Sequence, residues 1–355
     1  MQELSIADLP QSWRRPSNPK PIVVIGAGGI VNDAHLPAYR KAGFHVAGIY
    51  DVDPARSRAT AERFGISKVF GSLEEAFAAE NVVFDVAVPA EKTSAVLESI
   101  RDASVVLLQK PMGKDLEDAR SILQRCRAKG LCAAVNFQLR FSPMMLALRA
   151  AIEGGLIGRV VDLEVRLAIK TPWEMFPALK NLERVEILVH SVHYLDWIRS
   201  ILGDPKGVYA RTVRHPDNPE LKSSRTSAIL DYTDDVRCCL SLNHNFPSQR
   251  RHQEAAITLV GTEGAAAIKL GLLLNYPEGE PDELEVLPAG GEWTAVPLQG
   301  RWFPDAFIGT MANLQRFAAG EDEELPTSVE DAYKTMALVE ACYQSDASGA
   351  VPIPE

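Results

Sequence analysis

The sequence predicts an α/β protein: a doubly wound parallel sheet in the N-terminal part, then an α/β part with a large, mostly antiparallel open sheet. Three observations support this. The 355 residues are enough for two domains. Between residues 21 and 137, short β-branched runs alternate with amphipathic stretches, and after residue 137 the rhythm changes to longer strands separated by turn signals. We therefore expect an N-terminal arm over residues 1–20, one domain over 21–137 and a second over 138–355.

The first domain begins abruptly after an arm that contains three prolines. Its apolar runs predict strands at Ile22–Ile25, His45–Tyr50, Phe84–Val88, Val105–Leu108 and Cys132–Val135. The stretches between and after them predict helices at Ala34–Ala42, Ala55–Phe64, Leu73–Ala79, Ala90–Arg101 and Leu116–Lys129. Strands that read as continuous apolar runs need helices on both faces, and right-handed crossovers then make the sheet parallel and doubly wound.

The second domain is expected to open with helix, strand and helix at Pro143–Gly154, Val160–Ile169 and Ile187–Leu202. Strands are then predicted at Gly207–Val213, Thr226–Tyr232, Arg237–Asn243, Ala255–Val260, Ala265–Lys269, Leu284–Leu287 and Trp293–Val296. Turn signals such as Asp234-Asp235 and Gly290-Gly291 favour antiparallel pairing. Two helices, Asp305–Ala319 and Val329–Ser345, are expected at the end, the second with a capping signal at Thr327 and Ser328.

Composition excludes several classes of function. There are 37 basic and 47 acidic residues, a formal net charge of −10, which gives no general attraction for nucleic acid or anionic membranes. No apolar run approaches the ~18 residues that a membrane span needs. Arg14-Arg15 precedes the apolar run Ile22–Ile25, but that run is too short for an export signal, and cleavage there would remove the glycine turn described next. Five cysteines without a CxxC pair indicate reduced thiols, so we expect a cytoplasmic protein.

A glycine turn follows the first predicted strand and opens a helix. Gly26 allows a tight turn, Gly28 allows close approach of a pyrophosphate, and the helix N-terminus beyond Gly29 and Ile30 offers unpaired N–H groups to it. Val31 stands where a third small residue would ease helix packing, so the fingerprint is imperfect. The pattern predicts a dinucleotide site, and a plain tight turn is the alternative.

An acid ends the second strand at the position that binds an adenosine ribose in such sites. Asp51 lies 25 residues beyond Gly26, near the expected ~20. A carboxylate there accepts hydrogen bonds from ribose hydroxyls and repels a 2′-phosphate, which favours NAD over NADP. Arg56 and Arg58 lie close by and keep that choice open.

Two further groups are candidates for chemistry. Lys110 follows the strand Val105–Leu108, and ligands of open α/β sheets bind at the carboxyl ends of strands. Glu186, His190 and His193 share one stripe of a predicted helix, because positions three and four apart are neighbours. Such a titratable stripe is typical of a helix that lines a wet cleft, and a solvated surface helix has the same pattern.

Taken together, these features resemble the glucose–fructose oxidoreductase/inositol dehydrogenase family (Gfo/Idh/MocA) over residues 21–353. The motifs that carry the resemblance are Gly26–Val31, Asp51, Gln109-Lys110-Pro111, Asn136–Arg140–Pro143, His193 with Asp196, Gly261-Thr262-Glu263-Gly264, and Pro326-Thr327-Ser328 to Tyr343-Gln344-Ser345. The resemblance implies a Rossmann domain, NAD or less favourably NADP as cofactor, sugar-like alcohols as substrates, and dimers or tetramers formed through the large sheet.

The resemblance also implies site residues. The family's EKP lysine falls on Lys110 and its catalytic histidine on His193, with His190 as a further catalytic candidate. The expected cofactor-binding set is Gly26, Gly28, Gly29, Ile30, Val31, Asp51, Val88, Pro89, Gln109, Lys110 and Arg140. The expected substrate-binding set is Lys110, Trp173, Glu186, His190, His193 and Trp302, and no metal is expected. Trp173 and Trp302 fit a pocket wall and core packing equally well, and Arg140 fits a ligand contact or a tie between domains.

Three positions depart from the family pattern. Gln109 replaces the acid of EKP, Thr93 replaces a histidine, and Val189 replaces the aspartate four residues before the active histidine. Valine can neither orient His193 nor relay a proton, which leaves His190 and Glu186 as replacements. A family subset with an HSxH signature looks like this and includes aldose dehydrogenases of pentose catabolism, D-apiose dehydrogenases among them.

The leading hypothesis is an NAD-dependent oxidation of a sugar hydroxyl, an aldose C1 going to the lactone, with His193 as base and Lys110 on the same oxygen. An inositol, polyol or sugar-acid dehydrogenase is the alternative within this class. A metal-dependent lyase or hydrolase that uses Glu186, His190 and His193 as ligands is a second class. A non-catalytic NAD-binding regulator is a third.

Overall fold

The computed structural model describes residues 5–247 and 249–354. The first four residues of the expected arm, residue 248 and residue 355 lie outside this part. The chain forms two compact units. The parallel-sheet unit consists of Ser12–Ser142 and Phe303–Met336; the antiparallel-sheet unit consists of Pro143–Trp302 with the two ends of the chain, up to Gln11 and from Ala337.

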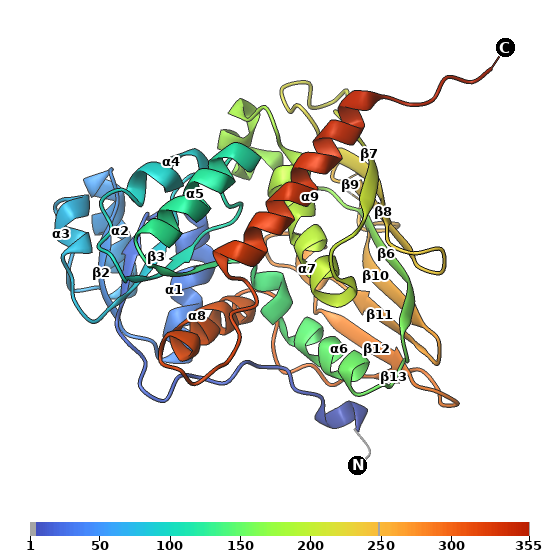
Figure 1. Cartoon of the computed structure of the whole chain (residues 1–355), viewed down its shortest axis with the longest axis horizontal. Helices are drawn as coiled ribbons and strands as arrows, with labels where there is room; N and C mark the ends of the chain where they lie inside the picture. The colour runs from blue at the N-terminus through green and yellow to red at the C-terminus, as the bar shows by residue number, and fades with distance from the viewer. Residues whose placement is uncertain (1–4, 248, 355) are drawn as a thin grey trace. The chain divides into compact units, whose positions relative to one another are not determined.

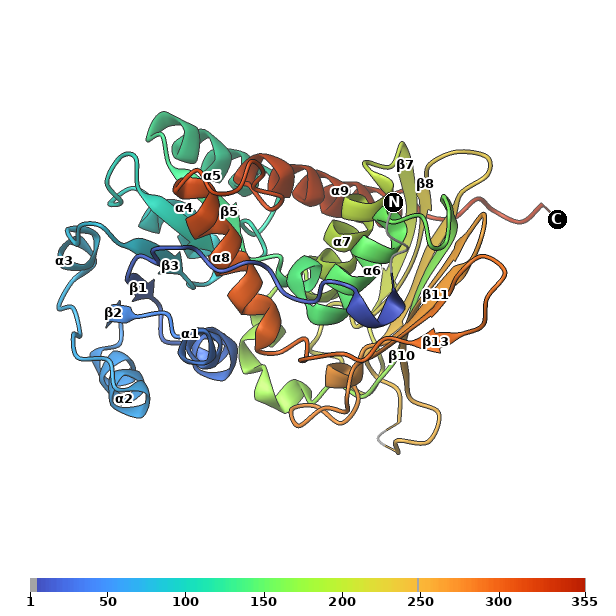
Figure 2. The same ribbon diagram turned by 90° about the horizontal axis from the view of Figure 1, so that it is seen from below.

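The parallel-sheet unit contains five parallel strands in the order β2-β1-β3-β4-β5. The strands are β1 (Ile22–Ile25), β2 (Val46–Tyr50), β3 (Val83–Val86), β4 (Val105–Leu108) and β5 (Cys132–Val135). The helices are α1 (Leu36–Ala42), α2 (Pro54–Phe64), α3 (Leu73–Phe77), α4 (Ala90–Val96), α5 (Leu116–Ala128) and α8 (Asp305–Ala318). Figure 2 shows α1 and α2 on one side of this sheet and α4 and α5 on the other. The predicted doubly wound sheet is confirmed.

The core of this unit explains why its strands are continuous apolar runs. All four residues of β1 and all four of β3 are buried, since helices cover both faces. Helix α8 is far away in the sequence, yet it packs on α1, β4 and β5, and Phe307, Met311 and Leu314 join the same hydrophobic cluster. The hydrophobic periodicity predicts this helix, but it does not predict that the helix belongs to the parallel-sheet unit.

A fully buried polar network crosses this core. His35 Nδ1 lies 2.7 Å from Asp85 Oδ2, and the Tyr39 hydroxyl donates to the same oxygen at 2.8 Å. Asn136 Nδ2 lies 3.3 Å from His35 Nε2, and Thr310 Oγ1 donates to Asn136 Oδ1 at 2.8 Å. The network fixes the helical segment after the glycine turn to β3 and α8.

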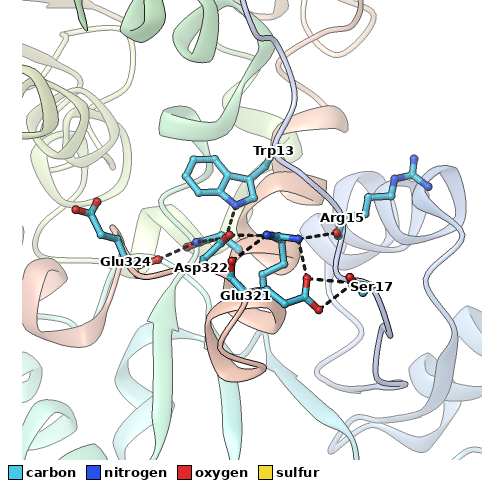
Figure 3. Close-up of polar contacts among 8 residues, drawn as sticks. Trp13, Arg15, Ser17, Glu321, Asp322 and Glu324 are labelled. Atoms are coloured by element: carbon cyan, nitrogen blue, oxygen red, sulfur yellow. Dashed lines mark hydrogen bonds and ion pairs between the residues drawn. The ribbon is translucent and has the colours of Figure 1, made fainter.

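The arm is held against the same unit over residues 12–20 (Figure 3). Trp13 Nε1 donates to Asp322 Oδ2 at 2.8 Å, and the Ser17 amide donates to Glu321 at 3.0 Å. Arg316 bridges both acids, at 2.8 Å to Asp322 and 2.7 Å to Glu321. Loop carboxylates at the end of α8 therefore hold an arm that has no regular structure along this stretch.

The antiparallel-sheet unit contains eight strands in the order β13-β12-β11-β10-β6-β9-β8-β7. They are β6 (Val160–Ala168), β7 (Gly207–Val213), β8 (Arg225–Asp231), β9 (Arg237–Asn243), β10 (Glu254–Gly261), β11 (Ala265–Lys269), β12 (Glu283–Leu287) and β13 (Thr294–Ala295). Neighbours pair antiparallel except β6 and β9, which are parallel. The expected mostly antiparallel open sheet is confirmed.

One face of this sheet is covered and the other is open. Helices α6 (Pro143–Glu153) and α7 (Val192–Leu202) lie on one side of it, as Figures 1 and 2 show. The last helix, α9 (Val329–Ser348), hydrogen-bonds to β7 near its end, where Ser345 Oγ accepts from the Ala210 amide at 2.9 Å. In β8, buried and exposed residues alternate, and the exposed face includes Ile229. Alternation of this kind is expected for a sheet that packs on one side only.

Two predicted helices begin differently in the structure. A π-helical segment, Val31–His35, precedes α1, and a second, Glu186–Ser191, precedes α7. The wider i→i+5 turn of a π-helix leaves no signature in a 3.6-residue pattern. Helix α4 ends at Val96, five residues before the predicted end, and the residues that follow form turns in which Leu97 and Ile100 are still buried. No helix of the described residues is long and apolar enough to cross a membrane.

Candidate active site

The glycine turn after β1 has a geometry that requires glycine. Gly26 has φ +107°, and a Cβ there would lie 2.3 Å from the Ala87 carbonyl oxygen. Its amide donates to the Tyr50 carbonyl at 2.7 Å, so the turn is tied to β2. A Cβ at Gly28, by contrast, would have nothing within 4 Å. The backbone at Gly28 is therefore open to the approach of a ligand.

A cavity of about 640 Å³ lies beside this turn, at the carboxyl end of the parallel sheet. Its wall includes apolar side chains of α3 and α4, namely Leu73, Ala95 and Val96, and the cations Arg56 and Lys92. Seven residues of the expected cofactor set line it: Gly26, Gly28, Ile30, Asp51, Val88, Pro89 and Gln109. Apolar walls with a few polar groups are typical of sites for small organic ligands.

Asp51 is fixed at the edge of this cavity by its own backbone surroundings. One carboxylate oxygen accepts from the Ala27 amide at 2.7 Å, and the other accepts from the Asp53 amide at 2.8 Å. Arg56 lies 3.8 Å from the first oxygen. Because each oxygen has a second lone pair, this pre-oriented carboxylate can still accept hydrogen bonds from a diol.

The residues after β4 lie at the same edge of the sheet. Gln109 lines the cavity, and its side-chain oxygen accepts from the Lys110 amide at 3.0 Å. Burial lowers the pKa of the Lys110 amine to about 8. An amine with such a pKa is divided between its charged and neutral forms in mildly alkaline solution, so it can donate or accept a proton there.

Four members of the expected cofactor set do not line the cavity: Gly29, Val31, Lys110 and Arg140. Val31 is fully buried in the core. Arg140 donates to the Pro326 carbonyl at 2.9 Å and pairs with Asp331 at 2.7 Å, so it ties the segment after β5 to the start of α9.

The antiparallel-sheet unit gathers two histidines and a tryptophan near the start of α7. The rings of His190 and His244 lie 4.5 Å apart, centre to centre, and are inclined by 39°. Trp173 packs against both, at 5.7 and 5.9 Å. His244 Nδ1 lies 2.9 Å from Thr171 Oγ1. His190 is half-buried, whereas His244 and Trp173 are buried.

Glu186 is fully buried and does not lie on an open stripe with the two histidines. Its carboxylate accepts from Ser191 Oγ at 3.0 and 2.8 Å and lies 3.3 Å from His244 Nε2. The π-helical segment that carries both Glu186 and Ser191 makes this closed arrangement.

His193 is half-buried one turn into α7 and packs edge-on against Trp302, with ring centres 6.0 Å apart and planes at 90°. Both predicted tryptophans, Trp173 and Trp302, are buried, and each contacts a histidine of the predicted set.

Among the residues that the structure describes, no group of three or more His, Cys, Asp or Glu side chains is arranged to hold a metal ion.

Comparison with known proteins assigns both units to one family. Residues 20–137 match the oxidoreductase family with an NAD-binding Rossmann fold, GFO_IDH_MocA, and residues 149–354 match the C-terminal α/β domain of the same family. The chain belongs to the Gfo/Idh/MocA oxidoreductase family. The resemblance expected from the sequence motifs is thereby confirmed, as is NAD binding by the Rossmann domain.

Three relatives of this Gfo/Idh/MocA protein are informative. It is 28% identical to D-apiose dehydrogenase of Rhizobium rhizogenes over 92% of this chain and 95% of that protein. It is also 28% identical to D-apiose dehydrogenase of Paraburkholderia graminis, over 90% and 86%. A solved oxidoreductase from Agrobacterium radiobacter, in complex with NAD+, L-tartaric acid and magnesium, has a TM-score of 0.77 and 26% identity over 94% of this chain and 98% of that one. As a member of this family, the protein is a dehydrogenase, as predicted.

Sequence reasoning missed His244, Thr171 and Ser191. Thr171 follows β6 and His244 follows β9, and these two strands are parallel neighbours paired through Ala168 and Asn243. Their carboxyl ends therefore meet at one edge. Both residues could have been recognised as following predicted strands. Placing them together, however, required knowing that β6 and β9 pair in parallel, unlike the other neighbouring strands described in this sheet.

Proposed function

We propose that this Gfo/Idh/MocA protein is an NAD-dependent dehydrogenase that oxidises a hydroxyl of a sugar, an aldose at C1 to the lactone, with a D-apiose-type pentose as the leading candidate. The observation that carries the proposal is the match to D-apiose dehydrogenases, 28% identity along 92% of the chain. The HSxH segment, which includes His190 and His193, supports the same subset.

For the cofactor, Asp51 is proposed to accept the adenosine ribose hydroxyls and to disfavour a 2′-phosphate. The Gly26 turn and the open backbone at Gly28 are proposed to lie against the pyrophosphate. Both assignments are supported by the cavity beside them and by the fixed orientation of the carboxylate. Bound NAD supplies the hydride acceptor.

For the reaction, His193 is proposed as the base that removes the hydroxyl proton, and Lys110 as the group that holds the same oxygen by a hydrogen bond. An alcohol gives up hydride readily only as its proton leaves, so a base with a pKa near the working pH is needed. The lowered pKa of Lys110, about 8, lets its amine share that proton.

A second candidate substrate class is a sugar acid or other hydroxy acid. The solved structure that is 26% identical was obtained with NAD+ and L-tartaric acid, which supports this alternative. The two classes differ in charge, so one panel of substrates separates them.

The test is NADH formation across aldoses, inositols and sugar acids, with NAD and NADP in parallel. We expect an aldose pentose to give the highest kcat/KM, with NAD preferred. Activity with hydroxy acids alone would favour the second candidate, and no NADH formation with any of them would refute the proposal. His193→Ala and Lys110→Met should each lower kcat at least ~10-fold while NAD binding persists.

The protein is further proposed to be cytoplasmic and to form a dimer or tetramer through the open face of its eight-stranded sheet. Tyr209, Ile229 and Val260 expose 70%, 54% and 45% of their surface on this sheet. Apolar side chains exposed on one sheet are a feature of interaction surfaces. Light scattering of Ile229→Glu should show smaller particles than the unchanged protein, and equal masses would refute this interface.

A further inference from the structure

The carboxyl group of Glu186 is buried beside a basic ring. Its side chain has no exposure to solvent, and burying an ionised carboxylate is costly unless a charge lies beside it. The hydroxyl of Ser191 donates to it but brings no charge. The basic group in contact is His244, whose Nε2 lies 3.3 Å from Oε1.

The other titratable groups that face Glu186 stay neutral. Tyr194 of α7 and Tyr343 of α9 both have a pKa raised by burial, with a further contribution from the charge of Glu186. Burial raises the pKa of the Cys342 thiol to about 12. Near neutral pH these groups are uncharged hydroxyls and a thiol, so none of them balances the carboxylate.

His244 is held in place for this contact from both sides. Nδ1 meets Thr171 Oγ1 at 2.9 Å, and a threonine hydroxyl can accept a hydrogen bond from a protonated ring. The His244 amide donates to the Ser224 carbonyl at 3.1 Å, and the Thr171 amide donates to the His244 carbonyl at 3.1 Å. The end of β9 therefore presents this ring to Glu186 in a fixed orientation.

The His244 ring also packs on the ring of His190, with centres 4.5 Å apart. Two imidazolium cations at that distance repel strongly where water is excluded. A charge on His244 therefore disfavours a charge on His190. Trp173 packs on both rings and limits their movement.

We propose that His244 and Glu186 are a positioning pair: His244 carries the positive charge that balances Glu186, and this cation keeps His190 neutral and oriented in the substrate site. The catalytic consequence rests on the proposed dehydrogenase function, whereas the charge states do not. A neutral His190 is able to accept a hydrogen bond from a substrate hydroxyl, and a protonated one is not.

The charge states are tested on the full-length protein by nitrogen NMR of its seven histidines, without substrate. We expect the His244 ring to be fully protonated near neutral pH, its signals being assigned by their loss in His244→Asn, and the His190 ring to be neutral. In Glu186→Gln, which preserves size and shape, the His244 signals should move to those of a neutral ring. A neutral His244 in the unchanged protein would overturn the proposal, whatever the activity.

The consequence for catalysis is tested by the pH dependence of kcat/KM. Loss of the neighbouring cation lets His190 take up a proton more easily. The acid side of the profile in Glu186→Gln and in His244→Asn should therefore move toward neutral pH by about one pH unit. The double variant should show the same shift as either single variant, since both remove one charge pair. NADH affinity should be unchanged.

A matched control is His215→Asn, because His215 lies 3.7 Å from Asp217 on the surface and should leave the profile unmoved. Additive shifts, or a fall in activity without a shift, would assign the pair a purely structural role. If the unchanged protein oxidises no substrate, the proposed function fails, and the NMR measurement still decides the charge states.

Discussion

Replacing Lys110 by methionine should stabilise the protein while removing its activity. Burial lowers the pKa of this amine from 10.5 to about 8. A difference of that size corresponds to about 3 kcal/mol by which the folded state disfavours the charged amine. The side chain keeps partial exposure, and solvent screening reduces the penalty, so we expect a gain of about 1–3 kcal/mol in the free energy of unfolding at neutral pH.

The sign of the pH dependence follows from proton binding. Between pH 8 and 10.5 the unfolded chain holds a proton on this lysine that the folded protein has released. Stability of the unchanged protein therefore rises with pH in that window, relative to Lys110→Met, and the difference between the two proteins disappears near its upper end. Below pH 8 the difference is largest.

Guanidinium unfolding of both proteins across this pH range measures the difference directly. Other tyrosines and cysteines titrate at high pH, but they do so in both proteins and cancel. Lys114→Met is the control, because that side chain is 63% exposed in the same loop and should change stability little. If Lys110→Met were less stable than the unchanged protein at pH 7, or if the difference did not depend on pH, burial would not be the cause of the lowered pKa.

Further substitutions test the cofactor site and the arm. Asp51→Asn should raise the Kd for NAD about 10-fold and reduce the preference over NADP, measured by fluorescence titration; an unchanged preference would contradict the ribose assignment. Gly26→Ala should abolish NAD binding, because its Cβ would lie 2.3 Å from a carbonyl oxygen, and binding within twofold of normal would refute this. Trp13→Phe should lower the free energy of unfolding by about 1.5 kcal/mol through loss of the bond to Asp322, while Trp293→Phe, at an exposed position, should not; equal denaturation midpoints would refute the role of this contact.

Much of the fold could be predicted because short patterns of neighbouring residues determine its strands and its glycine turn. The β1 run and the Cys132–Val135 run are strands with the predicted bounds, since strands buried along most of their length leave an uninterrupted apolar signature. Gly26 was identified from its strand–turn–helix context, and the structure shows the close approach to Ala87 that requires it. In these places a few adjacent residues determine the conformation.

What could not be predicted depends on contacts between distant segments. Residues 303–336 belong to the parallel-sheet unit, although more than 160 residues of the other unit precede them. The π-helical segment Glu186–Ser191 bends the expected polar stripe so that Glu186 turns inward. His244 reaches Glu186 only because β6 and β9 pair in parallel. None of these has a local signal.

The departure at Val189 can now be considered together with these contacts. In the family pattern an aspartate at that position stands one helical turn before the active histidine, where it can orient the ring. Here the nearby carboxyl group is that of Glu186, which does not occupy the position of that aspartate. Glu186 is buried beside His244, and the His244 ring packs on His190. An acidic residue therefore lies near the histidines, but the group that it contacts is a second imidazole. In the proposed pair the HSxH signature and His244 form one functional set, and a change at either should be accompanied by a change at the other.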